Sequence, residues 1–135
     1  MLFNPVELCK RMVRGTILKV LLVDDEKEMV SALAERLSFR DIDAEWVTSG
    51  KDAIALIGEN HFDVLVLDVK MPGMSGLETM KEILKIEPGS KIIFLTGHGS
   101  ALDRLACKEA GAFSYLMKPI NIEILVEKIK EAVEA

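Results

Sequence analysis

Carboxylate, hydroxyl and ammonium side chains follow directly after the apolar runs of this 135-residue chain. In chain order they are Asp24 and Asp25, Asp68, Thr96, and Lys118 followed by Pro119. If the runs are parallel strands, these ends meet at one sheet edge, where open α/β folds bind ligands. Three neighbouring carboxylates repel one another, and a divalent cation relieves that repulsion. Oxygen ligands of this kind suit Mg²⁺, with Mn²⁺ as an alternative.

A cation beside a carboxylate, an ammonium group and a hydroxyl group is suited to phosphoryl transfer. Asp68 would be the nucleophile that forms an aspartyl phosphate. The cation and Lys118 would neutralise charge on the transferred group. Taken singly, these residues have structural explanations, because Asp and Thr at strand ends often form turns or cap helices. The combination across four strand ends is more specific than any one member.

Five short apolar runs alternate with amphipathic stretches. The runs cover residues 17–23, 44–47, 64–67, 92–95 and 113–117. Three of them are almost continuously apolar, which is typical of strands buried on both faces of a parallel sheet. Repeated strand–helix alternation predicts βαβ units, and therefore an α/β domain with a helix-covered parallel sheet.

Helix signals lie between the runs. Apolar residues recur there at three- and four-residue steps. Ser75 with Glu78 forms a capping-box sequence, Ser49 with Asp52 resembles one, and Asn121 suits the N-cap of the last helix. These signals support four of the expected helices.

The segment 100–110 is the least periodic of the expected helices. Its apolar face would consist of Leu102, Leu105 and Ala106, with Ala101 at its margin. We therefore expect this helix to be the most weakly held.

Residues 1–15 precede the first strand as an extension. We expect a short helix over residues 5–13, because Asn4 can cap it and Pro5 suits its first position. Cys9, Met12 and Val13 would give that helix a small apolar stripe.

Composition narrows the classes of function. The chain carries 17 basic and 22 acidic residues, a formal charge of −5, and its basic residues are scattered. This balance argues against direct nucleic-acid binding by the domain. Two cysteines give no disulfide framework, and no apolar run has the roughly 18–20 residues of a membrane span. We expect a cytoplasmic protein without a membrane partner.

The chain resembles the receiver domains of response regulators, of the chemotaxis and two-component type. The resemblance rests on the motifs LVDDE, LDVKMPGMSG, LTG and YLMKP, at residues 22–26, 67–76, 95–97 and 115–119. It implies a receiver domain over residues 16–135. It also implies a flavodoxin-like, doubly wound sheet of five parallel strands in the order 2-1-3-4-5, with helices on both faces.

The resemblance assigns roles to the acidic residues. Asp68 would accept phosphate from a sensor histidine kinase or a phosphotransfer protein. Asp25, Asp68 and the backbone carbonyl of Lys70 would ligate Mg²⁺, and Asp24 would act through a metal-bound water. The protein would be a switch that catalyses only its own Mg²⁺-dependent phosphorylation and dephosphorylation.

The resemblance also implies a relay. Thr96 would hydrogen-bond the phosphoryl group, and Tyr115 would rotate inward behind it, changing the surface of the fourth helix, fifth strand and fifth helix. Lys118 would pair with the phosphate and precede a cis bond to Pro119. The side chains of Lys70 and His98 would flank the path of hydrolytic water and tune the phosphoryl lifetime.

Other interpretations fit less well or stay open. A haloacid-dehalogenase-type phosphatase needs a second Asp where Lys70 stands, and flavodoxin needs a phosphate-binding loop where Asp24 and Asp25 stand. A degenerate receiver that binds proteins without phosphate remains an alternative. A stand-alone regulator with a downstream protein target, and a fragment separated from an output domain, both fit. Oligomeric state is open, a phosphorylation-dependent homodimer included.

Overall fold

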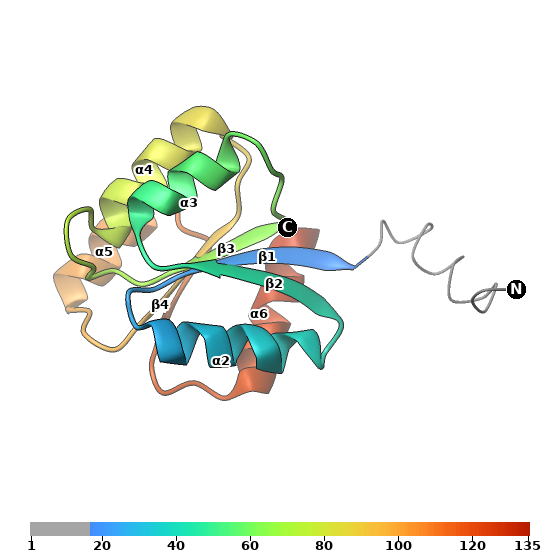
Figure 1. Ribbon diagram of the computed structural model, residues 1–135. Helices are drawn as coiled ribbons and strands as arrows, with labels where there is room; N and C mark the ends of the chain where they lie inside the picture. The colour runs from blue at the N-terminus through green and yellow to red at the C-terminus, as the bar shows by residue number, and fades with distance from the viewer. Residues whose placement is uncertain (1–16) are drawn as a thin grey trace, which may run out of the picture.

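The structure is a computed structural model, and it describes residues 17–135. Its central sheet consists of β1 (Leu18–Val23), β2 (Ile42–Val47), β3 (Val64–Leu67), β4 (Ile92–Thr96) and β5 (Ser114–Met117). The helices are α2 (Lys27–Ser38), α3 (Gly50–Ile57), α4 (Gly76–Ile86), α5 (Ala101–Glu109) and α6 (Ile122–Glu134). Each strand is followed by a helix, as the alternation of patterns predicts (Figure 1).

The five strands are parallel and lie in the order β2-β1-β3-β4-β5. This confirms the expected topology. Every residue of β3 and β4 is buried, because helices cover both faces of the sheet centre. The edge strands β2 and β5 are less buried, which explains the weaker apolar signal of their sequences.

Two apolar layers hold the helices to the sheet. Helices α2 and α6 cover one face, and α3, α4 and α5 lie on the other (Figure 1). On the first face, Leu37 and Ile129 are fully buried with strand residues such as Val20. On the second, Met80 and Ile83 of α4 pack among buried residues that include Phe94. Alternate strand residues therefore serve opposite layers.

The least periodic segment does form a helix, but the predicted apolar face was wrong. Leu102 is 77% exposed, Leu105 is 53% exposed, and Ala106 is also exposed. Cys107 is instead the buried residue of α5, and burial raises its pKa to about 11. Because Cys107 is the one side chain that α5 buries, the sequence of this helix shows little apolar periodicity.

Helix caps agree with the sequence signals and add one. Ser75 and Glu78 form the expected reciprocal capping box at the start of α4. Ser49 accepts a hydrogen bond from the Asp52 backbone N–H, which is half of such a box. A second complete box, between Ser100 and Asp103, begins α5 and was not predicted. This box compensates in part for the small buried area of α5.

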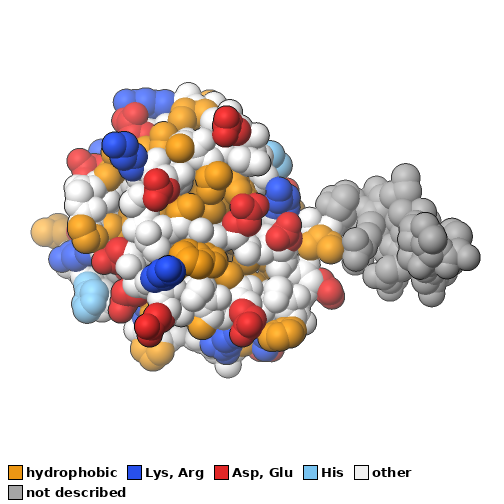
Figure 2. Space-filling model, in the orientation of Figure 1, with side chains coloured by type: hydrophobic (Ala, Val, Ile, Leu, Met, Phe, Trp, Pro, Cys, Tyr) orange, Lys and Arg blue, Asp and Glu red, His pale blue; other side chains and the backbone are white. Residues whose placement is uncertain are grey.

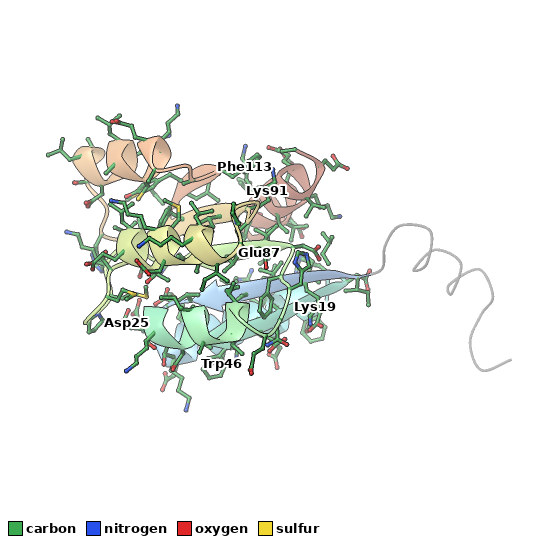
Figure 3. All side chains as sticks on the ribbon, turned by 90° about the horizontal axis from the view of Figure 1, so that it is seen from above. Lys19, Asp25, Trp46, Glu87, Lys91 and Phe113 are labelled. Atoms are coloured by element: carbon green, nitrogen blue, oxygen red, sulfur yellow. The ribbon has the colours of Figure 1, made fainter. Side chains whose placement is uncertain are left out.

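One face of the molecule carries side chains of all types. Acidic, basic and apolar side chains are interspersed on the face shown in Figure 2. Seen from above, Asp25 lies at one end of the sheet, and Lys19, Glu87 and Lys91 lie toward the other (Figure 3). Within residues 17–135, no helix is long and apolar enough to cross a membrane. The helix expected over residues 5–13 lies outside the described residues.

Candidate functional site at the carboxyl edge of the sheet

Strand register brings the chemically capable residues to one edge. Val23 of β1 pairs with Leu67 of β3, and the Asp68 backbone N–H donates to the Val23 carbonyl at 2.9 Å. Asp24 and Asp68, the next residues along, therefore lie side by side. On the other side of β3, Leu67 pairs with Phe94, two residues before Thr96.

Three carboxylates converge there. Oxygen atoms of Asp24, Asp25 and Asp68 lie within 4.8 Å of one another. The side chains of Asp24 and Asp68 are buried, whereas Asp25 is exposed. Two carboxylates of the cluster are therefore shielded from solvent, and the third lies at its solvent-exposed side. The strand-end positions of the three residues predict this convergence, and the distances agree with it.

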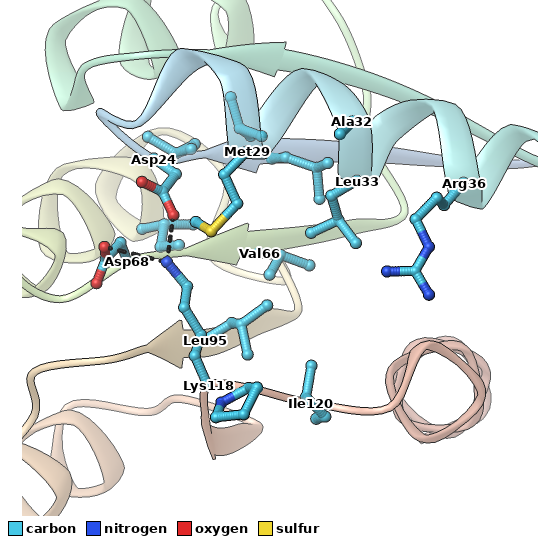
Figure 4. A pocket seen from close by; sticks show the side chains of 15 residues that line it. Asp24, Met29, Ala32, Leu33, Arg36, Val66, Asp68, Leu95, Lys118 and Ile120 are labelled. Atoms are coloured by element: carbon cyan, nitrogen blue, oxygen red, sulfur yellow. Dashed lines mark hydrogen bonds and ion pairs between the residues drawn. The ribbon is translucent and has the colours of Figure 1, made fainter.

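Lys118 brings the compensating positive charge (Figure 4). Its ammonium nitrogen lies 2.6 Å from Asp24 Oδ2 and 3.6 Å from Asp68 Oδ2. The side chain of Lys118 is only 16% exposed, so water screens these pairs less than it screens a surface ion pair. Lys118 thus binds Asp24 more closely than Asp68.

Glu26 also belongs to the cluster, although the sequence motifs assign it no role. Its Oε1 lies 3.9 Å from Lys118 Nζ, and its backbone N–H donates to Asp24 Oδ1 at 2.9 Å. The available signal was the run of three acidic residues that begins at Asp24. Glu26 is placed to share the ammonium group at the solvent side.

One oxygen in the cluster has no partner. Asp68 Oδ1 is buried and, among the described residues, accepts no hydrogen bond. A buried carboxylate oxygen without a donor is costly unless a ligand completes it. Three carboxylates and one ammonium also leave negative charge in excess. A hard divalent cation such as Mg²⁺ fits this donor set, because it prefers a few carboxylate oxygens and retains waters.

Thr96 ends β4, the strand next to β3, and its carbonyl accepts from the Lys118 backbone N–H at 2.8 Å, while Tyr115 lies on the neighbouring strand β5. Thr96 is fully buried, and its hydroxyl oxygen accepts from the His98 backbone N–H at 3.3 Å. The Tyr115 ring lies inward, 6.2 Å from the Phe94 ring and 5.9 Å from the Arg104 guanidinium. Burial raises the pKa of Tyr115 above its ordinary value. Its hydroxyl group is buried without a hydrogen-bond partner in the described part of the chain.

The remaining predicted site residues lie around the rim. The side chains of Lys70 and His98 are exposed. The Lys118–Pro119 peptide bond is cis, as the family resemblance implies. A recess of about 450 Å³ begins at Asp68 and Lys118 and continues beside α2, with Met29 and Leu33 among its apolar walls (Figure 4).

The sequence of residues 20–130 matches the family model described as "Response regulator receiver domain". The chain belongs to this family. Receiver domains of response regulators are signalling switches that interact with histidine kinases or phosphotransfer proteins. The expected fold and family are thereby confirmed.

Curated relatives of this receiver domain are longer proteins. The chain is 40% identical over 112 residues to the transcriptional regulatory protein CpxR of Klebsiella pneumoniae subsp. pneumoniae (strain HS11286). That match covers 83% of this chain and 47% of CpxR. The chain thus spans less than half the length of this relative.

Solved receiver structures agree in fold. A CheY-like receiver domain protein from Methanospirillum hungatei JF-1 superposes with a TM-score of 0.84 and 32% identity. The match covers 88% of this chain and 95% of that one. A response regulator protein from Burkholderia pseudomallei, solved with a phosphorylated aspartic acid, a calcium ion and citrate, gives a TM-score of 0.79 at 25% identity. Here 87% of this chain and 69% of that one are covered.

Proposed function

We propose that this receiver domain accepts a phosphoryl group on Asp68 from a phosphohistidine of a sensor histidine kinase or phosphotransfer protein. The observation that carries the proposal is the buried Asp68 Oδ1 beside Asp24, Asp25 and Lys118, which accepts no hydrogen bond from the described part of the chain. The phosphorylated aspartic acid and calcium ion of the Burkholderia relative support it by similarity.

The proposed transfer is a displacement at phosphorus. An Asp68 carboxylate oxygen forms the new O–P bond, while the N–P bond of the phosphohistidine breaks and the imidazole nitrogen keeps the electron pair. The developing negative charge on the phosphoryl oxygens falls near the Lys118 ammonium group. Lys118 is already within 3.6 Å of Asp68, so it needs only a small movement to pair with the phosphoryl group.

Asp25, Asp68 and the Lys70 backbone carbonyl are the residues that would hold a divalent cation, with Asp24 acting through a bound water. Such a cation supplies charge neutralisation for the phosphoryl oxygens. The buried position of Asp24 and Asp68 excludes bulk water, which strengthens these electrostatic interactions.

The proposed output is a change at the surface formed by α5, β5 and α6. The Thr96 hydroxyl would leave its contact with the His98 N–H and hydrogen-bond the phosphoryl group. The Tyr115 ring of β5 already lies inward next to Thr96, so the expected rotation is not needed, and phosphorylation would instead hold the ring in this position. A downstream protein or an output domain would sense this surface, because the relatives are longer transcriptional regulators.

Phosphorylation by acetyl phosphate tests the proposal directly. Incubation with radiolabelled acetyl phosphate and Mg²⁺ should label the protein, and Asp68→Asn should abolish the label. Asp43→Asn is a suitable control, because Asp43 is exposed on β2 and pairs in register with Lys19, away from the carboxyl edge. Equal labelling of Asp68→Asn would contradict the proposal. A wild-type protein that takes no label and binds no beryllofluoride would favour the phosphate-independent binding module.

A further inference from the structure

Gly76, the first residue of α4, lies against the backbone of the proposed phosphoacceptor. A Cβ atom at residue 76 would overlap the carbonyl oxygen of Asp68. It would also lie 2.9 Å from the Asp68 carbonyl carbon and from Val69 Cα. All three obstacles are main-chain atoms, so no side-chain rotation can relieve them.

The conformation of Gly76 does not itself demand glycine. Its φ is not in the left-handed region, in contrast to that of Gly73 in the preceding loop. Residue 76 is therefore glycine because of what it touches, since an L-residue with a side chain can adopt the same backbone angles.

Hydrogen bonds fix this contact from both sides. The Gly76 N–H donates to the Val69 carbonyl at 2.7 Å. The capping box of Ser75 and Glu78 fixes the first turn of α4. The loop from residue 69 to residue 75 is thus closed where it leaves β3 and where it enters α4.

We propose that Gly76 is a positioning residue for the phosphoacceptor site. Its lack of a side chain lets α4 seat directly on the Asp68 main chain, which fixes both the Asp68 carboxylate and the loop that carries the Lys70 carbonyl. This inference rests on the proposed function of Asp68. It adds a residue that contacts neither cation nor phosphate but determines where their ligands lie.

The geometry sets the size of the expected effect. A methyl group at residue 76 forces the Asp68–Val69 backbone or the start of α4 to move. Mg²⁺–oxygen bonds are short, about 2.0–2.1 Å, and tolerate little displacement of their ligands. A misplacement of about 1 Å at a reacting group can cost roughly 100-fold in rate.

Gly50 provides a matched control within the same chain. It is the first residue of α3 and is buried, as Gly76 is in α4. A Cβ at Gly50 would overlap as severely, but its obstacles are the side chains of Thr79 and Met74 rather than Asp68. Gly50→Ala therefore places a methyl group in an equally crowded buried position, against side chains that can move, without touching the backbone of the phosphoacceptor.

The experiment compares Gly76→Ala and Gly50→Ala with the wild type. Mg²⁺ affinity is measured by titration calorimetry, the rate of labelling by acetyl phosphate is measured at saturating Mg²⁺, and thermal unfolding gives the folded fraction. We expect Gly76→Ala to weaken Mg²⁺ binding about tenfold or more and to slow labelling by roughly 100-fold. We expect Gly50→Ala to lower Tm while changing Mg²⁺ affinity by less than about twofold.

Two further variants keep the test decisive if Gly76→Ala does not fold. Ser75→Ala removes the hydroxyl that accepts from the Glu78 backbone N–H at the start of α4, and Ser100→Ala removes the equivalent hydroxyl at the start of α5. Only Ser75→Ala should weaken Mg²⁺ binding. The inference is overturned if folded Gly76→Ala binds Mg²⁺ and accepts phosphate like the wild type, or loses no more than Gly50→Ala. It is equally overturned if Ser75→Ala and Ser100→Ala do not differ. A wild type without Mg²⁺-dependent labelling would instead contradict the proposed function itself.

Discussion

The hydroxyl group of Tyr115 occupies the space into which a side chain at residue 99 would project. A Cβ built on Gly99 overlaps the Tyr115 oxygen and lies 2.8 Å from the ring carbon that carries it. The same Cβ would lie 2.9 Å from Thr96 Cγ2. Because Gly99 has no side chain, the Tyr115 ring can occupy this space next to the Thr96 methyl group.

Gly99→Ala should turn Tyr115 outward. The obstacle is the far end of a flexible side chain, so the ring can leave at lower cost than the backbone can move. The hydroxyl group also loses no hydrogen bond by leaving, because within residues 17–135 it has no partner where it is buried. Nuclear Overhauser contacts between the Tyr115 ring and the Thr96 methyl group measure the change, and they should disappear.

Gly97→Ala is the control for this substitution. A Cβ at Gly97 meets only Lys118 side-chain carbons at 3.8 Å, an ordinary van der Waals distance. Tyr115 should remain inward in that variant. Persistence of the Tyr115–Thr96 contacts in Gly99→Ala would show that the loop after β4 moves instead of the ring.

Titration of Tyr115 reports the same equilibrium. Burial raises its pKa above the ordinary value of 10.0, and Tyr115 is the only tyrosine of the chain. Tyrosinate absorbance should therefore rise with a midpoint above 10 in the wild type. In Gly99→Ala the midpoint should return toward 10, because the ring is then solvated.

The sign of the pH dependence follows from that shift. The folded state favours the neutral phenol, so this stabilising contribution is complete below the unfolded pKa, about 10. It is lost as pH rises through the higher folded pKa. Tyr115→Phe removes the ionisable group, and its stability should decline less than that of the wild type in this alkaline range. Equal declines would contradict the assignment.

Helix α5 should respond to loss of its cap in a local manner. Ser100→Ala removes the hydroxyl that accepts a hydrogen bond from the Asp103 backbone N–H, and loss of such a cap typically costs about 1 kcal/mol. Because Cys107 is the only buried residue of α5, the helix can fray without opening the core. Amide exchange should accelerate within residues 101–109 and stay unchanged in α4. Uniform acceleration across both helices would mean that α5 unfolds only with the whole domain.

Sequence patterns predicted the fold where burial is complete and failed where it is partial. The strands β3 and β4 are buried on both faces, so their apolar runs stood out. The edge strand β2 begins at Ile42, two residues before the predicted start, because Asp43 alternates to the exposed face and hides the pattern. In α5, the exposed Leu102 and Leu105 suggested a buried face that Cys107 alone supplies.

The sequence predicted some features of the candidate site and not others. Residue type and strand-end position sufficed to place Asp24, Asp25 and Asp68 together, since parallel strands share an edge. The closer pairing of Lys118 with Asp24 than with Asp68 depends on distances that no spacing encodes. The steric role of Gly76 was equally hidden, because a missing side chain leaves no chemical signal.

Phosphoryl lifetime is the property on which Lys70 and His98 should act. Hydrolysis needs a water in line with the Asp68–phosphorus bond. Both residues belong to the loops that flank Asp68 and Thr96, and the His98 backbone already contacts the Thr96 hydroxyl. Their side chains are exposed, so the Lys70 charge is screened and adds little attraction. Bulk that blocks the water is therefore the main expected effect.

Removing that bulk should shorten the phosphorylated state. We expect Lys70→Ala and His98→Ala each to speed loss of radiolabel by about threefold to tenfold, which corresponds to roughly 1 kcal/mol in the barrier, and the double variant to exceed both. Lys108→Ala, which removes an exposed lysine from the last turn of α5, controls for loss of charge alone. The measurement is the decay of labelled protein at fixed Mg²⁺ after removal of the phosphodonor. If the two side chains instead extend into solvent, they do not block the hydrolytic water, and their removal leaves the phosphoryl lifetime unchanged. Lifetimes equal to or longer than that of the wild type would therefore show that neither residue limits the approach of the water.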